Sequence, residues 1–564
     1  MHELKTTSRP SFLFVMALLM LVTTPVWGQE STDTTTVSWV SVLPPLLAII
    51  LALALRQVIP ALFFGVWFGA WAINGFSIMG LWQGLLDSFQ IHILDAVADP
   101  GHAAVILFSL MIGGTVGIIS RNGGMQGVVN LIVGWADDAR HACLATATLG
   151  LAIFFDDYAN TLVVGNTMRP VTDSMKVSRA KLAYIVDSTA APVATFALVT
   201  TWIGYQVGLI GESLSYIPDL EAEAYLMFLS TIPYSFYPLL AVFFVFMVCY
   251  TGRDFGPMAK CEREARTRIG EMDGHLDSAL AEDCELDGPV EGKPLRAINA
   301  ILPIAVLVLS VMGGLYFTGL ASAGDSATGL KDIIGAADSN KSLMWGSLIG
   351  MITAAALTLS QRIISLEEVV DAWYKGVKAM FYAMIILALA WALGGITEIL
   401  GTADYLVSVL GDTLPVQWLP VIVFVLAAFT AFATGSSWGA MGILIPLVIP
   451  LTWAVMKASG FDGPDDMHIL YSSIAGVLAG SVWGDHCSPI SDTTILSSMA
   501  SGCDHIEHVR TQIPYAVLVA VVSMLLCAIP VAYGFPWWAA LATSAVVLLV
   551  VLRVAGRKPE SPAG

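Results

Sequence analysis

The chain has 564 residues, of which 56% are hydrophobic and only 12% charged, and its formal net charge is -18. Soluble domains carry roughly a quarter charged residues, so this composition excludes an ordinary soluble protein and indicates a polytopic membrane protein. The acidic balance, without a basic stripe that interleaves with aromatic residues, also excludes a nucleic-acid-binding protein.

The first 28 residues differ from the rest of the chain. Lys5 and Arg9 precede the apolar run SFLFVMALLMLVTTPVWG, which carries the small residues Val26 and Gly28 near its end. This pattern resembles a cleavable signal peptide, and an uncleaved first transmembrane helix is the alternative. In either case, the polar segment ESTDTTTVS that follows is expected outside the cytoplasm.

Apolar runs close to the ~20 residues that a helix needs to cross a bilayer recur along the rest of the chain. Because lipid cannot hydrogen-bond an open backbone, these runs are expected to be helices. We therefore predict an all-α fold with about 11–13 transmembrane helices. The apolar runs are 38–56, 57–76, 103–120, 142–166, 191–211, 225–250, 298–320, 342–360, 377–400, 417–455, 469–483, 512–534 and 536–554.

The distribution of Lys and Arg orients these helices. Basic residues concentrate in 169–181, in 251–296 and in the C-terminal tail, and the positive-inside rule places these segments in the cytoplasm. Connections with few basic residues, such as 211–225 and 459–468, are expected on the other face. The predicted domains are a signal-like segment or first span (1–28), a first transmembrane repeat (38–250), a charged cytoplasmic loop (251–296), a second transmembrane repeat (297–535), and a final span with a basic tail (536–564).

An internal repeat relates the two transmembrane parts. MIGGTVGII (111–119) is echoed by ALGGITEIL (392–400), FDDYANTL aligns with GSSWGAMG, and AAPVAT aligns with CSPISD in the same order. The connections that follow FDDYAN and GSSWGA differ in charge, so the two copies should point in opposite directions. Inverted repeats with discontinuous helices are typical of secondary transporters. Chance similarity between apolar segments is the alternative.

Asp156 and Asp157 stand near the middle of a long apolar stretch. A carboxylate at bilayer depth costs about 2.5–3.5 kcal/mol on insertion scales, so such residues usually line a polar pathway. Two adjacent carboxylates titrate as a unit and favour binding of a proton or a cation. A short cytoplasmic loop between two half-spans is the alternative interpretation.

The stretch GDHCSPISDTT (484–494) places polar residues in a second apolar region. If helical, Asp485, Ser488 and Asp492 share a face, but Pro489 should break or kink that helix and free backbone carbonyls. Oxygen donors with carboxylate charge suit an alkali cation. The predicted ion and proton site comprises Asp156, Asp157, Asp485, Asp492, Ser488, Ser491 and Thr493, with Na⁺ at Asp157, Asp485 and Asp492.

Further candidates flank these motifs. TGSSWGAMG (434–442) predicts a helix break where Ser436 and Ser437 could meet a substrate carboxylate, or else a helix-packing face. Asp187 either caps a half-helix or joins the site, and Asn160 is a further candidate for substrate or ion binding. His486 is either a pH gate or an ordinary hydrogen-bonding histidine, and no zinc-ligand spacing surrounds it. No cofactor is expected beyond transported Na⁺ and H⁺.

At these motifs the chain resembles the NhaC family of sodium/proton antiporters. The similar stretches are GDHCSPISDTT, FFDDYANTLVVGNTMRPVTD, SRAKLAYIVDSTAAPVA and ATGSSWGAMGILIPL, and the resemblance covers roughly residues 40–535. It implies a cation/proton exchanger in the cytoplasmic membrane, with a bacterial inner membrane expected, and it includes relatives that exchange organic acids such as malate and lactate. The signal-like N-terminus and the charged 251–296 loop fall outside the family pattern.

The leading functional hypothesis is therefore Na⁺/H⁺ exchange. A Na⁺- or H⁺-coupled carrier of organic acids or amino acids is the first alternative. An intramembrane hydrolase or zinc enzyme is the second, although the sequence contains no HExxH motif and no Ser/His/Asp order that predicts a catalytic triad. The expected partners are the lipid bilayer, a small cation and a proton, with an organic anion and homo-oligomerisation left open.

Overall fold

The computed structural model describes residues 38–558, except 56, 135, 199, 221, 268–287, 324–332, 334–336, 403–404, 406–408, 410–414 and 490. The signal-like segment 1–28 and much of the predicted 251–296 loop lie outside the described residues. So do the side chains of Leu53, Ala159, Ser339 and Asp492.

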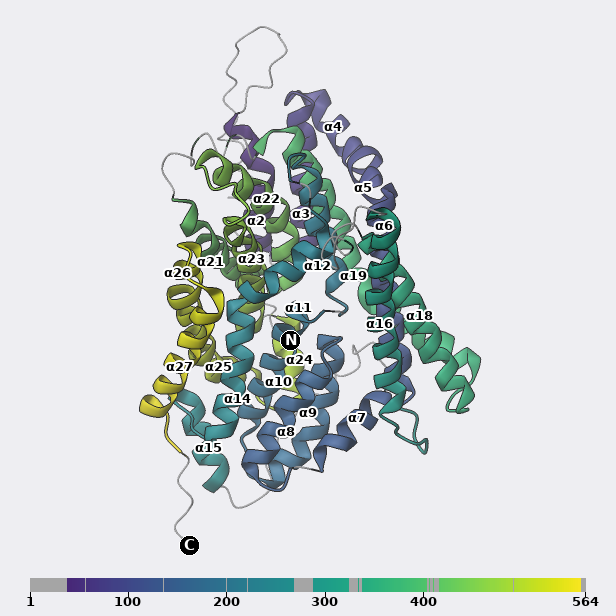
Figure 1. Cartoon of the computed structure of the whole chain (residues 1–564), viewed down its shortest axis with the longest axis vertical. Coiled ribbons are helices and arrows are strands. Elements are labelled where there is room, and N and C mark those ends of the chain that lie inside the picture. The colour runs from purple at the N-terminus through teal and green to yellow at the C-terminus, as the bar shows by residue number, and fades with distance from the viewer. Residues whose placement is uncertain are drawn as a thin grey trace, which may run out of the picture. The chain divides into compact units, whose positions relative to one another are not determined.

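The described residues form an all-helical bundle, as predicted, and contain no strand beyond one isolated bridge between Asp254 and Arg557 (Figure 1). The helices in chain order are η1 Trp39–Val42, α2 Leu43–Leu55, α3 Val58–Ile73, α4 Ile78–Asp87, η2 Ser88–Ile93, α5 Leu94–Ala98, α6 Pro100–Arg121, α7 Gly124–Val133, α8 Ala139–Ala152, α9 Asp157–Ser174, α10 Arg179–Thr189, α11 Ala191–Phe196, α12 Ile203–Ser215, α13 Ala224–Thr231, η3 Ile232–Tyr234, α14 Phe236–Thr251, α15 Gly256–Thr267, α16 Ile298–Ala323, α18 Ser339–Ser360, α19 Leu366–Ile399, η6 Val416–Trp418, α21 Leu419–Thr434, α22 Ser437–Ala458, α23 Met467–Cys487, α24 Asp492–Ser501, α25 His505–Val522, η7 Ser523–Ala528, α26 Ile529–Ala532 and α27 Trp537–Ala555.

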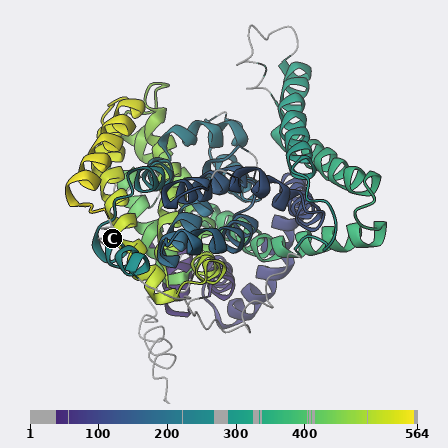
Figure 2. The same ribbon diagram turned by 90° about the horizontal axis from the view of Figure 1, so that it is seen from below.

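Within the described residues, eight helices are long and apolar enough to cross a membrane, or nine if α13–η3 and α14 form one bent span. This is fewer than expected, because several apolar runs are broken or short. The run 142–166 is divided between α8 and α9, and α2 and α3 have only 13 and 16 residues. The pair α16 and α18 lies at one edge of the bundle (Figure 2).

The Asp156–Asp157 motif lies at a helix break. Residues 153–156 separate α8 from α9, and the side chains of Asp156 and Asp157 are buried there. Arg140, at the start of α8, lies over the Tyr250 ring, and Lys181, just beyond α9, pairs with Asp254. Because Tyr250 and Asp254 are neighbours in the chain, α8 and α9 form a hairpin that begins and ends on the predicted cytoplasmic face.

A second hairpin, α21–α22, has its tip at Gly435 and Ser436. Gly435 ends α21 in the left-handed conformation (φ 69°), which glycine adopts without steric cost, and the Ser436 hydroxyl caps α22 by accepting from the Gly439 N–H. The predicted break at TGSSWGAMG is thus confirmed. Lys457, at the far end of α22, pairs with Asp219 in the connection predicted to face the outside. The two hairpins are consistent with inverted repeats, which stay a prediction.

Each hairpin is followed by a broken helix. Ala190 interrupts the chain between α10 and α11, and residues 488–491 interrupt it between α23 and α24. Pro489 has no N–H to continue α23, so the predicted break is confirmed. Asp485 and Asp492 therefore belong to two different helices, and the expectation of a shared helical face does not hold.

A buried cluster of charged residues connects α15 to α10. Lys181 Nζ lies 2.8 Å from Asp254 Oδ2 and 3.8 Å from Glu262 Oε2. The Tyr515 hydroxyl donates to Asp254 Oδ1, and Glu262 Oε1 accepts from the Ser178 N–H at 2.7 Å. Burial raises the pKa of the Glu262 carboxyl, and the Lys181 ammonium opposes that shift. Among the described residues, Lys181 is thus the cation that lies between these two buried acids.

We expect Lys181→Met to destabilise the protein by roughly 3–5 kcal/mol, because it leaves buried carboxylates without their cation. The measurement is the melting temperature of the detergent-solubilised protein, followed by tryptophan fluorescence. Lys260→Met is the matched control, because Lys260 is exposed, and it should leave the melting temperature nearly unchanged. Equal melting temperatures for the two variants would contradict this account.

Candidate functional site

The helix breaks at 153–156 and 190 are joined by the side chain of Asn160. Its amide donates to the carbonyl oxygens of Gly150 (2.7 Å), Ile153 (3.2 Å) and Thr189 (3.1 Å). Carbonyls at a helix end have no partner within the helix, and lipid offers none. Asn160 thus stabilises two breaks at once. Its predicted role in ion or substrate binding stays a prediction.

Trp202 connects the tips of the two hairpins. Its indole Nε1 donates to Asp157 Oδ1 at 2.9 Å, and its ring lies 5.2 Å from that of Trp438, in the first turn of α22. The Tyr205 hydroxyl, one turn further along α12, donates to the Trp438 carbonyl. These contacts bring Asp157 and the Ser436–Ser437 break into one region of the molecule.

The carboxylate of Asp485 is surrounded by hydroxyl groups from the following break and the start of α24. Ser491 Oγ donates to Asp485 Oδ1 at 2.7 Å, and Thr493 Oγ1 donates to Asp485 Oδ2 at 3.1 Å. The two hydroxyl oxygens lie 2.9 Å apart. All three side chains are buried. This small volume therefore contains two carboxylate oxygens and two hydroxyl oxygens, the donor types that suit an alkali cation.

Three further contacts hold this cluster in place. Ser488 Oγ donates to the Phe432 carbonyl of α21 at 2.7 Å. Thr494 Oγ1 lies 3.3 Å from the carbonyl oxygen of Asp485 and 3.4 Å from that of His486, at the end of α23. The last carbonyls of α21 and α23 are thus satisfied by hydroxyls from the 488–494 stretch. Ser488, predicted as an ion ligand, therefore also links two helix breaks.

The helices α9 and α24, which begin with Asp157 and Asp492, pack against each other in parallel. A Cβ atom on Gly165 would lie 2.6 Å from Cβ of Ala500, and one on Gly502 would lie 2.6 Å from the Arg169 guanidinium carbon. Residue numbers increase together at these two contacts, so the helices run in the same direction. Asp157 and Asp492 are each eight residues before the Gly165–Ala500 contact, and both helix N-termini therefore lie at the same end.

This arrangement has an electrostatic consequence. A helix N-terminus carries a partial positive charge, which stabilises an ionised carboxylate in its first turn. The preceding helices α8 and α23 direct their carbonyl ends, which are partly negative, toward the same breaks. Partly positive helix N-termini and partly negative helix C-termini therefore lie next to Asp157 and Asp485. None of the contacts described above brings a formal positive charge to these two carboxylates.

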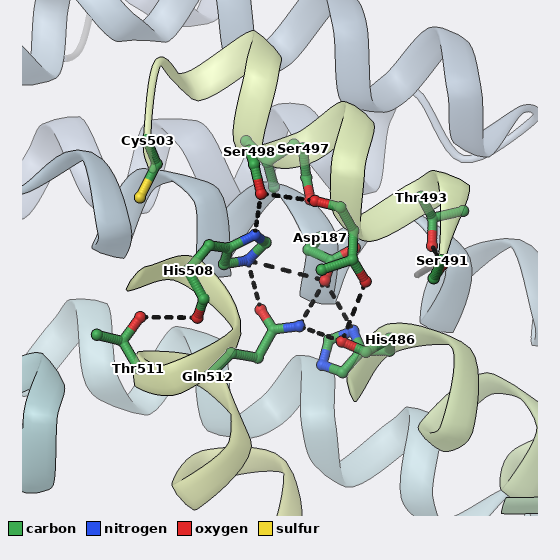
Figure 3. A network of polar contacts seen from close by, with 12 residues as sticks. Asp187, His486, Ser491, Thr493, Ser497, Ser498, Cys503, His508, Thr511 and Gln512 are labelled. Carbon is green, nitrogen blue, oxygen red and sulfur yellow. Dashed lines mark hydrogen bonds and ion pairs between the residues drawn. The ribbon is translucent and has the colours of Figure 1, made fainter. Parts of the chain in front are cut away.

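Asp187 lies in a second polar network, shown in Figure 3. The Gln512 amide nitrogen donates to both Asp187 Oδ2 and the His486 carbonyl. Its oxygen Oε1 lies 2.8 Å from His508 Nε2. Asp187 Oδ2 is also 3.5 Å from His486 Nδ1 and 3.9 Å from His508 Nε2. Because these side chains are almost fully buried, Asp187 joins a polar network between α10, α23 and α25.

The network continues from His508 toward the surface. His508 Nδ1 lies 2.8 Å from Ser498 Oγ, which lies 3.1 Å from His505 Nδ1 (Figure 3 draws the inner part). His505 is partly exposed, and its Nε2 contacts the Pro489 carbonyl at 2.7 Å. Nearby, Arg179 donates to the Gly502 carbonyl, so this end of the network lies on the predicted cytoplasmic face.

The predicted residues thus fall into three neighbouring groups. Asp157 lies with Trp202, Asp485 with Ser491 and Thr493, and Asp187 with His486. Among the described residues, no three His, Cys, Asp or Glu side chains gather in metal-binding geometry. The Asp492 side chain is not described, so the predicted Na⁺ site at Asp157, Asp485 and Asp492 stays a prediction.

Sequence reasoning missed four residues that shape this region: Trp202, Ser498, His508 and Gln512. A usable signal was present for two of them. His505, His508 and Gln512 recur at intervals of three and four residues, which places them on one face of α25. Nothing local distinguishes Trp202 from the lipid-facing aromatic residues of other apolar runs.

Comparison with known proteins identifies the family of the chain. The model of the Na⁺/H⁺ antiporter family matches residues 193–529. A Haemophilus influenzae protein, described as uncharacterized, is 34% identical over 93% of this chain and 96% of its own length. A shorter match, 36% identical, covers 20% of this chain and 22% of the arginine/ornithine antiporter ArcD of Halobacterium salinarum.

Among solved structures, the YdaH transporter of Alcanivorax borkumensis covers 81% of this chain and 90% of its own, with a TM-score of 0.53 and 14% identity. This likeness concerns the fold alone. The family consists of transporters, which excludes the hydrolase and zinc-enzyme alternatives. With more than half of its length matched by the family model, the chain is a multi-pass secondary transporter that belongs to the Na⁺/H⁺ antiporter family.

Proposed function

We propose that this protein exchanges Na⁺ for H⁺ across the cytoplasmic membrane. The observation that carries the proposal is the placement of buried carboxylates at helix breaks that contact one another. Asp157 and Asp485 are each 1% exposed, and each lies at or near the broken end of a helix. The family match supports cation transport.

Competition for the same oxygen atoms would couple the two ions. Na⁺ requires an ionised carboxylate, whereas a bound proton removes that charge, so one carboxylate cannot hold both. The hydroxyls of Ser491 and Thr493 now donate to Asp485, and each retains lone pairs that can bind a cation. Protonation of Asp485 would weaken this donor set and release Na⁺.

Alternating access would follow from movement of the hairpin tips against the broken helices. The tips contact each other through Trp202 and Trp438. The breaks also contact each other through single side chains such as Asn160 and Ser488. Such contacts can exchange without unfolding a helix, so the site could open to either face in turn.

We further propose that His505, Ser498 and His508 carry protons between the cytoplasm and Asp187. The Ser498 hydroxyl has one proton and lies within 3.1 Å of three acceptor atoms: the Thr494 carbonyl, His508 Nδ1 and His505 Nδ1. When Ser498 donates to Thr494, His508 Nδ1 must itself carry a proton to bond with Ser498. This series of hydrogen bonds is thus compatible with both a charged and a neutral His508, as proton transfer requires.

Replacement of the site carboxylates tests the exchange. In proteoliposomes with an imposed proton gradient, we expect the wild-type protein to dissipate the gradient when Na⁺ is added. Asp157→Asn and Asp485→Asn should each reduce this to the rate of protein-free liposomes, because an amide cannot bind a proton at these pH values. Asp157→Asn keeps an oxygen that can accept from Trp202. Asp485→Asn keeps one oxygen that can accept from Ser491 or Thr493, and the other hydroxyl can rotate to accept from the new amide group.

Asp371→Asn is the matched control, because Asp371 is exposed and pairs with Lys375 on the same helix. It should transport at the wild-type rate. Wild-type rates for both Asp157→Asn and Asp485→Asn would reject the site, and no response of the wild-type protein to Na⁺ would reject the exchange.

The proton route is tested by His508→Gln. We expect the exchange rate to fall roughly tenfold or more, while binding of radioactive Na⁺ is retained, because His508 contacts none of the Asp485 hydroxyl donors. Added imidazole should restore part of the rate, since a diffusible base can replace the missing ring. His141→Gln, at an exposed cytoplasmic position, is the control. A loss of rate that imidazole leaves unchanged would indicate a structural role instead.

A second candidate function is cation-coupled transport of an amino acid or organic acid. The N-terminus of α22 lies at a break beside Asp157, through Trp202 and Trp438, and helix N-termini bind carboxylates. The partial match to an arginine/ornithine antiporter also supports it. Thermal-shift measurements with arginine, ornithine, malate and lactate distinguish the two functions, since stabilisation that Ser437→Ala removes is expected only for the second.

A further inference from the structure

A basic hollow opens on the predicted cytoplasmic face, away from the site described above. Its volume is about 690 Å³, and the described residues that line it include no Asp or Glu. Four separate parts of the chain contribute to it: the start of α8, the end of α14 with the residues just after it, the end of α15, and the last turn of α27 with the segment that follows. The lining residues are Arg140, Tyr250, Thr251, Gly252, Arg253, Arg266, Arg553 and Lys558.

Two of the five cationic side chains, those of Arg253 and Arg140, are held by uncharged groups. Arg253 Nη1 donates to the carbonyls of Arg553 (3.1 Å) and Gly556 (2.8 Å). The Arg140 guanidinium lies 4.1 Å above the Tyr250 ring. Arg266 Nε is buried without a hydrogen-bond partner among the described residues. The nearby acids Asp254 and Glu262 contact Lys181 and are not among the residues that line the hollow.

The hollow lies where membrane helices end. Thr251 is the last residue of α14, and Arg553 lies in the last turn of α27. Apolar side chains beside it are exposed, with 57% of Tyr250, 52% of Val550 and 82% of Val554 accessible. Val550 precedes Arg553 by about one helical turn. An apolar surface suited to acyl chains therefore reaches the hollow from the membrane side.

We propose that the basic hollow binds the phosphate-bearing headgroup of an anionic phospholipid of the cytoplasmic leaflet. Guanidinium groups match phosphate oxygens in charge and geometry, and basic pockets at the cytoplasmic ends of membrane helices suit such headgroups. Free phosphate offers the same charge but makes no use of the exposed apolar surface. A bound lipid would connect α8, the first helix of the Asp156–Asp157 hairpin, with α14, α15 and the C-terminal segment.

Lipid binding to the full-length protein tests this proposal. We would delipidate the protein in a neutral detergent and titrate it with phosphatidylglycerol, cardiolipin, phosphatidylcholine or inorganic phosphate, counting bound lipid by native mass spectrometry. We expect both anionic lipids to bind more tightly than phosphatidylcholine. The double variant Arg140→Gln/Arg266→Gln should weaken their binding roughly thirtyfold, because two cationic contacts are lost.

The matched control is Lys260→Gln/Arg263→Gln, which removes two exposed positive charges from α15 outside the hollow. It should bind anionic lipid as the wild-type protein does. Equal weakening by both double variants would overturn the proposal, since it would indicate attraction to overall charge. Binding of inorganic phosphate with the affinity of the lipids would also overturn it, because the apolar surface would then contribute nothing. Melting temperatures of the unliganded variants identify any loss caused by misfolding.

Discussion

The main constraint on this structure is that backbone groups at broken helices must be satisfied inside an apolar bundle. Lipid and packed aliphatic side chains supply no hydrogen bonds, so each free carbonyl needs a donor from the protein. Asn160, Ser488, Thr494 and Gln512 are such donors. Each connects a break to another element or to the helix that follows it, and the breaks are therefore held as a group.

The same constraint accounts for the chemistry of the region. A continuous helix uses its carbonyls and amides internally, whereas a broken helix leaves them available and directs its dipole toward the break. Asp157 and Asp485 lie where these polar ends meet, with hydroxyls and an indole N–H as partners. Hydrogen bonds thus stabilise carboxylates whose burial in lipid would be energetically unfavourable. These carboxylates can still exchange one hydrogen-bond partner for another.

Several distant parts of the chain also meet on the predicted cytoplasmic face. Lys181, at the start of α10, binds acids of the segment that follows α14, and the other end of α10 carries Asp187. The backbone of Asp254 pairs with that of Arg557 in the C-terminal segment. The short helix α10 thus lies between the polar network around Asp187 and the predicted cytoplasmic surface, and a displacement of one end of α10 would displace the other.

Hydropathy alone predicted more membrane-spanning helices than the described residues contain. An apolar run of suitable length predicts burial, but it does not distinguish a helix that crosses the bilayer from a hairpin that turns back inside it. The run 142–166 is a hairpin with its tip at Asp156 and Asp157. The acidic pair at its centre was the local signal for that break.

The sequence by itself determined the membrane class, the all-helical fold, the breaks at Gly435 and Pro489, and the two acidic motifs, because composition, proline, glycine and buried charge act locally. Only the tertiary structure decided which donors meet which acceptors. Asn160 and Thr189 are 29 positions apart, Trp202 and Asp157 are 45 apart, and Gln512 and Asp187 are 325 apart. Such pairs depend on how helices pack, and close contacts such as that of Gly165 with Ala500 set the register, which no local pattern specifies.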